Sequence, residues 1–188
     1  MELQLDSFKQ NCSCGRQHLI TIEKIIIDSN SLSEVSAFIN EKGLASYPMI
    51  ICDTNTYQTG GSKLQELLKI TDQQMIVLNA KDLHADEFGL KAIKEQFNHQ
   101  ASVFIAVGSG TIHDLTSCEF NRPFISVPTA ASVDGFASTV AAMTFNGFKV
   151  TTKAKAPLAI FADTSIIAKA PRYLSAAGVG DLLAKYTA

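Results

Sequence analysis

The sequence predicts an α/β fold in which helices cover both faces of a parallel sheet. Short, almost uniformly apolar segments alternate along the chain with segments whose apolar residues recur at helical spacing. An uninterrupted apolar segment indicates a strand buried on both faces, which is typical of a parallel sheet. The 188 residues suffice for one complete domain and part of another.

Six apolar segments are expected as strands; four helices are expected between them and a fifth after the last strand. The strands are residues 22–28, 48–53, 74–79, 102–107, 123–127 and 157–162. The helices are residues 31–42, 61–70, 86–97, 111–118 and 163–168. Helical spacing is clear for Leu90, Ile93 and Phe97, which would share one buried face.

Two segments do not follow this alternation. Residues 141–145 and 148–152 flank Asn146-Gly147, which predicts a two-residue β-hairpin. Residues 172–188 are expected to be helical, and no glycine, proline or cap closes them. We therefore expect an α/β domain over residues 1–170, followed over 171–188 by the first helix of a truncated, all-helical second domain.

Composition excludes several classes of function. The net charge is −2 and the pI is near 6.1, which disfavours a nucleic-acid partner because such proteins need a clustered basic face. The sequence offers no apolar stretch of ~20 residues for a membrane span. Because the first residues lack a signal-peptide pattern and the four cysteines do not form a disulfide pattern, a cytoplasmic location is expected.

A glycine loop between an expected strand and helix is the first candidate site. Gly108-Ser109-Gly110 follows the strand at 102–107, and a helix begins directly after it. Glycines allow close approach of a ligand, and a helix N-terminus offers free N–H groups and a positive dipole end. The loop suits a phosphate or pyrophosphate. A tight turn without a ligand is the alternative.

Polar residues follow two other strands. Asp53 ends the strand at 48–53 and could accept bonds from a ribose hydroxyl, or simply cap a helix. Thr129, Ser132, Asp134 and Ser138 crowd the segment after the strand at 123–127, and loops at this edge of an α/β sheet hold ligands. A capped loop without a ligand explains this second cluster equally well.

Asp181 is the last candidate. It follows Gly178-Val179-Gly180 and could begin a helix, or supply one carboxylate of a metal site whose other ligands lie elsewhere. Cys12, Cys14 and His18 form a further group of soft ligands, but a structural zinc site normally needs four, so reduced thiols are the favoured interpretation.

Together these motifs resemble the glycerol-1-phosphate dehydrogenase family, part of the superfamily of iron-containing alcohol dehydrogenases and dehydroquinate synthases. The resemblance is carried by residues 108–114 (GSGTIHD), 127–135 (VPTAASVDG) and 177–185 (AGVGDLLAK), in this order and spacing. It extends to residues 12–18 and covers essentially the whole chain, but only the amino-terminal, Rossmann-like nucleotide-binding domain of the family and the first helix beyond it. Many members carry glycine where Ser109 stands.

The resemblance implies a role for each motif. The cofactor would be NAD or NADP, bound by Asp53, Gly108, Gly110, Thr111, Ile112, His113, Asp114, Thr129, Ala130, Ala131, Ser132 and Ser138. Backbone N–H groups of residues 110–114 would hold the pyrophosphate, and the His113 side chain would be solvated or near the helix cap. Asp134 would bind substrate. Asp181 would touch substrate and ligate a divalent metal: zinc, nickel or iron.

The implied reaction interconverts dihydroxyacetone phosphate and sn-glycerol 1-phosphate with NAD(P)H. The substrate would be a small phosphorylated polyol, and the chain would form a homodimer. In the family two histidines of the helical domain complete the metal site, and His18, His84, His99 and His113 do not match their positions. The chain is therefore expected to be inactive alone. The alternatives are a glycerol dehydrogenase of the same superfamily and a non-catalytic nucleotide-binding module.

Overall fold

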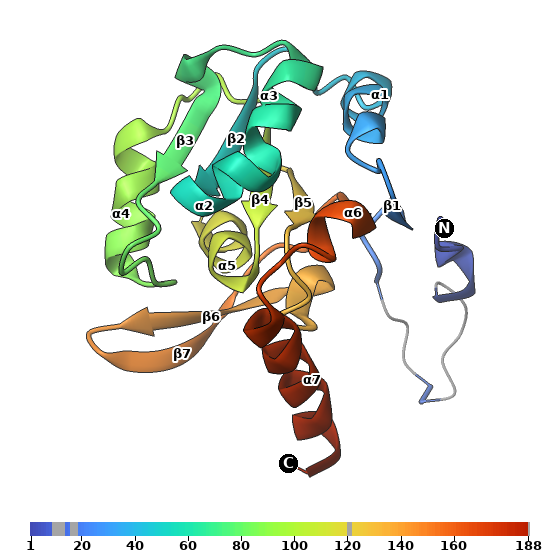
Figure 1. Ribbon diagram of the computed structural model, residues 1–188, viewed down its shortest axis with the longest axis vertical. Helices are drawn as coiled ribbons and strands as arrows, with labels where there is room; N and C mark the ends of the chain where they lie inside the picture. Colours follow the sequence, from blue (N-terminus) through green and yellow to red (C-terminus); the bar gives the residue numbers. More distant parts are fainter. Residues whose placement is uncertain (9–13, 16–18, 120–121, 188) are drawn as a thin grey trace.

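The computed structural model describes residues 1–8, 14–15, 19–119 and 122–187, and its centre is a six-stranded sheet (Figure 1). The strands are β1 (Lys24–Asp28), β2 (Pro48–Asp53), β3 (Met75–Leu78), β4 (Val103–Gly108), β5 (Phe124–Pro128) and β8 (Ala159–Asp163). Their order is β1-β8-β5-β4-β2-β3, and every pairing is parallel. The predicted α/β fold with a parallel sheet is confirmed.

Helices cover the two faces of the sheet. The α-helices are α1 (Ser33–Glu41), α2 (Thr54–Thr56), α3 (Ser62–Leu68), α4 (Glu87–Gln96), α5 (Gly110–Glu119), α6 (Thr164–Ile167) and α7 (Arg172–Thr187). Successive residues of β2 face opposite sides: Ile50 packs in a core with α1, α3 and α6, whereas Ile51 packs in a second core with α4 and α5. Burial on both faces explains why the strands are almost wholly apolar.

The predicted hairpin is present beside the sheet. It consists of β6 (Val140–Phe145) and β7 (Phe148–Lys153), which pair antiparallel. Asn146 and Gly147 both have positive φ, at 50° and 81°, as a two-residue turn of this kind requires. Ala141 and Met143 of β6 are buried in the core that contains α5. The hairpin thus closes one face of the domain.

The largest departure from the sequence prediction lies between β2 and α3. The chain is already helical from Thr54, through α2 and a π-helical turn, η2 (Tyr57–Gly61), whereas the sequence predicted a helix only from residue 61. Gly60 and Gly61 disfavour a helix by themselves. Here they are buried: a Cβ on Gly60 would lie 3.4 Å from side-chain atoms of Ile166 and Val107, so this turn packs directly on the sheet and α6.

Short 3₁₀ turns complete the described fold. They are η1 (Leu5–Phe8), η3 (Asp72–Gln74) and η4 (Gly135–Ala137). Cys12 and His18 of the cysteine–histidine group lie outside the described residues, so its role stays a prediction. Within the part of the chain that the structure describes, no helix is both long enough and apolar enough to cross a membrane.

Candidate functional site

A cleft of about 720 Å³ lies at the carboxyl ends of β2, β4 and β5. This is the edge at which open α/β sheets bind ligands. Three of the predicted motifs meet here, because strands that are neighbours in the sheet bring their following loops together. The predicted site residues that line the cleft are Asp53, Gly110, Thr111, Ile112, Asp114, Thr129, Ala130 and Ser132.

The glycine loop presents the first turn of α5 to this cleft. The first bond of the helix that reaches back to the loop runs from the His113 N–H to the Ser109 carbonyl, at 3.1 Å. The N–H groups of Gly110, Thr111 and Ile112 precede this bond and have no acceptor within the helix. A Cβ on Gly108 would lie 2.6 Å from Ile112, so only glycine permits this tight turn. The geometry suits an anion at the amides of residues 110–112.

His113 does not take the place that the sequence predicted. Its side chain is buried, and its ring packs edge-on against Phe124 and Phe136, with centroids 5.3 and 5.6 Å away. Its Nδ1 lies 3.3 Å from the Ser126 hydroxyl, and burial lowers the pKa of the imidazole to about 4. The expectation of a solvated side chain was wrong, and the backbone N–H is used within the helix.

Asp114 lies one residue further, and its carboxyl group lines the cleft. Burial raises its pKa to about 6, although a hydrogen bond from the Ala142 backbone partly opposes this effect. That bond also links α5 to strand β6 of the hairpin. Asp114 therefore serves the packing of the hairpin as well as the wall of the cleft.

Asp53 caps a helix, as one of its two interpretations expected, and it also lines the cleft. Its Oδ1 accepts hydrogen bonds from the N–H groups of Asn55 and Thr56, each at 2.8 Å, and the Thr56 hydroxyl accepts one from the Asp53 N–H. This reciprocal arrangement is a capping box. It holds the carboxylate in one orientation, which leaves Oδ2 for a ligand.

The loop after β5 is tied to the glycine loop. The Thr129 N–H donates to the Gly108 carbonyl at 3.0 Å, and the hydroxyls of Ser109 and Ser132 are hydrogen-bonded to each other. Ser109 thus takes part through its side chain, which a glycine there would lack. Ser138 lies away from the cleft, where its hydroxyl accepts from the Val140 N–H at 3.0 Å. Gly108, His113 and Ala131 are likewise absent from the lining of the cleft.

A second cluster brings together the two predicted substrate carboxylates. The Asp134 N–H donates to the Asp181 carboxylate at 2.9 Å, and the Asp134 carboxylate lies 3.3 Å from Nζ of Lys185. Asp181 and Lys185 are one turn apart on α7. The helix can come this close because Gly178 packs on the Ala131 carbonyl, which a Cβ would approach to 2.0 Å. Sequence reasoning proposed both aspartates but not their contact.

The donors in this cluster do not make a complete metal site. Across the described residues no group of three or more His, Cys, Asp or Glu side chains could hold a metal ion. Asp134 is engaged by Lys185, so Asp181 is the carboxylate that this cluster offers to a metal. A single carboxylate falls short of the three or four protein ligands that zinc takes.

Sequence reasoning missed two parts of the cleft wall. Asn55, Thr56 and Thr59 come from the helical segment after β2. Lys169, Ala170 and Pro171 come from the connection between α6 and α7, and Tyr173 and Leu174 from the first turn of α7. This connection follows the end of β8. The same rule that singled out the loops after β2, β4 and β5 could therefore have identified it.

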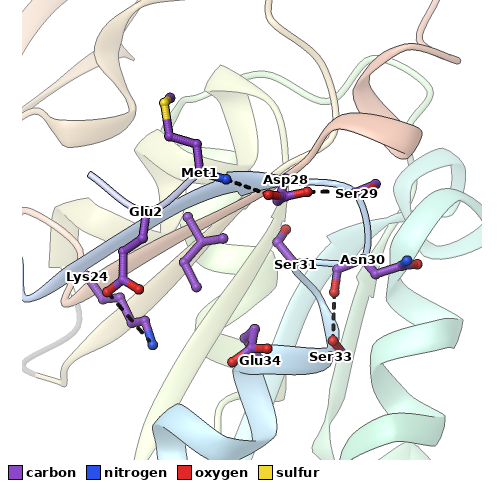
Figure 2. A pocket seen from close by; sticks show the side chains of 10 residues that line it. Met1, Glu2, Lys24, Asp28, Ser29, Asn30, Ser31, Ser33 and Glu34 are labelled. Carbon is purple, nitrogen blue, oxygen red and sulfur yellow. Dashed lines mark hydrogen bonds and ion pairs between the residues drawn. The ribbon is translucent and has the colours of Figure 1, made fainter. Parts of the chain in front are cut away.

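A separate cavity of about 420 Å³ lies at the carboxyl end of β1 (Figure 2). Its walls come from Met1 and Glu2, β1, and the start of α1. Four of its charged groups form two ion pairs: the amino group of Met1 binds the Asp28 carboxylate, and Nζ of Lys24 lies 4.0 Å from Glu2. No described residue lines both this cavity and the cleft. None of the predicted cofactor, substrate or metal residues lines this cavity.

Comparison with known proteins gives the family. A profile described as iron-containing alcohol dehydrogenase matches residues 26–171. The chain is 40% identical over 185 residues to glycerol-1-phosphate dehydrogenase [NAD(P)+] of Halalkalibacterium halodurans, covering 94% of this chain and 46% of that protein. It is 42% identical over 176 residues to the enzyme of the same name from Bacillus velezensis, covering 89% and 44%.

The chain spans about half the length of the curated relatives it matches. Among solved structures, glycerol dehydrogenase from Schizosaccharomyces pombe superposes with a TM-score of 0.69 at 22% identity, covering 92% of this chain and 45% of that one. That likeness shows the shared fold. The profile match spans most of the chain, which therefore belongs to the iron-containing alcohol dehydrogenase family.

Proposed function

We propose that this chain is the dinucleotide-binding part of an NAD(P)-linked glycerol-1-phosphate dehydrogenase. The observation that carries the proposal is the cleft, which is lined by Asp53, the free amides of α5 and the loop after β5 together. Relatives at about 40% identity are named as this enzyme and as users of NAD(P)+. The reaction is the interconversion of dihydroxyacetone phosphate and sn-glycerol 1-phosphate.

The dinucleotide would lie along the cleft from β2 to β5. Oδ2 of Asp53 would accept hydrogen bonds from the adenosine ribose, since Oδ1 is engaged by the helix cap. The pyrophosphate would accept bonds from the amides of residues 110–112. Thr129, Ala130 and Ser132 would line the path towards the nicotinamide. In this arrangement the protein aligns the nicotinamide ring with the carbon that gives or takes the hydride.

The substrate would bind beyond the cleft, at the Asp134–Asp181 cluster. We infer that Asp134 binds a hydroxyl of the polyol and that Asp181 is one ligand of a divalent metal: zinc, nickel or iron. The described residues supply no complete donor set for that metal, so chemistry at the substrate carbonyl would depend on ligands outside this cluster. A homodimer and a cytoplasmic location stay predictions of the sequence.

Calorimetric titration with NADH, NADPH and ADP-ribose, with and without zinc or nickel, tests the proposal. We expect dinucleotide binding that needs no metal. A Gly110→Val variant should lose dinucleotide binding. A Cβ added at Gly110 would lie 3.3 Å from Val133, and the larger valine side chain would cover the α5 amides. Gly180→Val is the matched control, since a Cβ there meets nothing within 4 Å. A folded chain that binds none of the three ligands would contradict the proposal.

A further inference from the structure

We propose that Lys169 lets the cleft accept the 2′-phosphate of NADPH beside Asp53. This inference rests on the proposed dinucleotide site and names a specificity-determining residue within it. A carboxylate that binds the ribose hydroxyls ordinarily favours NADH, because it repels a phosphate at the same position. A cation on the facing wall of the cleft would offset that repulsion.

The backbone around Lys169 is held in place by a short capped helix. Asp163, fully buried at the end of β8, caps α6 by accepting bonds from the Ser165 N–H and hydroxyl, at 3.0 and 2.6 Å. At the other end of α6 the Lys169 N–H donates to the Ile166 carbonyl at 3.0 Å. The backbone of Lys169 is therefore fixed near the carboxyl end of β8, just after α6.

This point lies next to the turn that follows Asp53. A Cβ on Gly60 would lie 3.4 Å from Cδ1 of Ile166, so the 57–61 turn packs against α6. Thr59 from that turn, Thr56 from the preceding α2 and Lys169 just after α6 line the same cleft as Asp53. Lys169 is thus on the ribose side of the proposed dinucleotide.

The charges of the cleft make Lys169 distinctive. Among the described residues that line the cleft, Asp53 and Asp114 are acidic and Lys169 is the single basic residue. Lys169 is exposed, and no described carboxylate forms an ion pair with its ammonium group. Because the ammonium is a compact point charge on a flexible stem, it can reach a phosphate without a fixed geometry.

The test compares NADH and NADPH binding to the whole chain and two variants. Lys169→Met keeps most of the apolar stem and removes the charge, and Lys149→Met, on the exposed face of β7, is the matched control. We expect Lys169→Met to weaken NADPH binding about tenfold, as for a charged hydrogen bond, and to leave NADH within about twofold. Lys169→Arg should keep NADPH binding, and salt should reduce the difference.

Each other outcome has a definite meaning. If Lys169→Met weakens NADH and NADPH equally, or changes neither, Lys169 does not read the 2′-phosphate and the inference is wrong. If the unmodified chain binds NADH but not NADPH, the inference fails while the dinucleotide site stands. If the folded chain binds neither, the proposed function fails as well.

Discussion

Replacing Gly178 by alanine tests whether α7 docks on the loop after β5 as described. In an exposed helix this change stabilises by about 1 kcal/mol, because alanine is the better helix former. Here the new Cβ would lie 2.0 Å from the Ala131 carbonyl oxygen and 3.0 Å from its carbon. Ordinary contact requires α7 and the loop to separate by about 1 Å or more.

That separation has a local and a global consequence. The bond from the Asp134 N–H to Asp181, now 2.9 Å, would stretch beyond hydrogen-bonding distance. Overpacking costs about 1–3 kcal/mol, so after the gain in helix propensity the variant should be less stable by up to about 2 kcal/mol. The loss is bounded because Gly178 is the one buried residue among the described residues of α7, and the helix can undock.

Gly180→Ala is the control on the same helix, since its Cβ would meet nothing within 4 Å. It should gain up to about 1 kcal/mol, which separates the two variants by about 1–3 kcal/mol in urea denaturation. Hydrogen exchange at the Asp134 amide should accelerate in Gly178→Ala alone. If the two variants are equally stable and equally protected at Asp134, the described docking of α7 is wrong.

Three further predictions concern the cleft. Asp53→Ala should destabilise the chain by about 1 kcal/mol in urea, because the helix from Thr54 loses its cap, whereas Asp53→Asn should not. Equal stability of the two variants would argue against the capping box. Ser109→Ala should lower stability by about 1 kcal/mol through loss of its bond to Ser132 but keep NADH binding in calorimetry; lost binding would make the hydroxyl a ligand. The pH dependence of stability combines two opposing groups. The pKa of His113 is lowered to about 4, so the unfolded chain takes up that proton first and stability falls as the pH drops from about 6.5 to 4. The pKa of Asp114 is raised to about 6, so the folded chain takes up its proton first and stability rises between about pH 6 and 4. In Asp114→Asn only the effect of His113 remains, so the free energy of unfolding should fall by roughly 3 kcal/mol as the pH drops from about 6.5 to 4. In His113→Gln only the effect of Asp114 remains, so the free energy of unfolding should rise as the pH drops from about 6 to 4. Urea denaturation measures both, and parallel curves for the two variants would contradict these shifts.

The sheet could be predicted because its strands are buried on both faces. Residues 48–53 were predicted with the bounds that β2 has, since apolar side chains on successive positions leave few other interpretations. The hairpin was equally predictable from the sequence, because Asn146-Gly147 supplies the positive φ values that its turn needs. Local chemistry and burial agree in these segments.

Tertiary contacts decided what the sequence could not. Gly60 and Gly61 disfavour a helix until the packing of the turn on Ile166 and Val107 is known. His113 is buried partly by Phe136, which lies 23 positions later in the chain, so no local sequence pattern predicts this contact. The wall formed by Lys169 was predictable in principle, because the connection after β8 leaves the same edge of the sheet as the loops after β2, β4 and β5.

The position of β8 also has a consequence for synthesis on the ribosome. β8 lies between β1 and β5, and Lys24 of β1 pairs with Ala159, 135 positions later in the chain. At ~5–20 residues per second, this partner of β1 is translated roughly 7–27 seconds after it. Until then the described residues give it only Met1–Leu3 to pair with, along its other edge. The nascent chain should therefore bind a chaperone over residues 22–28 until β8 emerges, and crosslinking on stalled ribosomes would detect it.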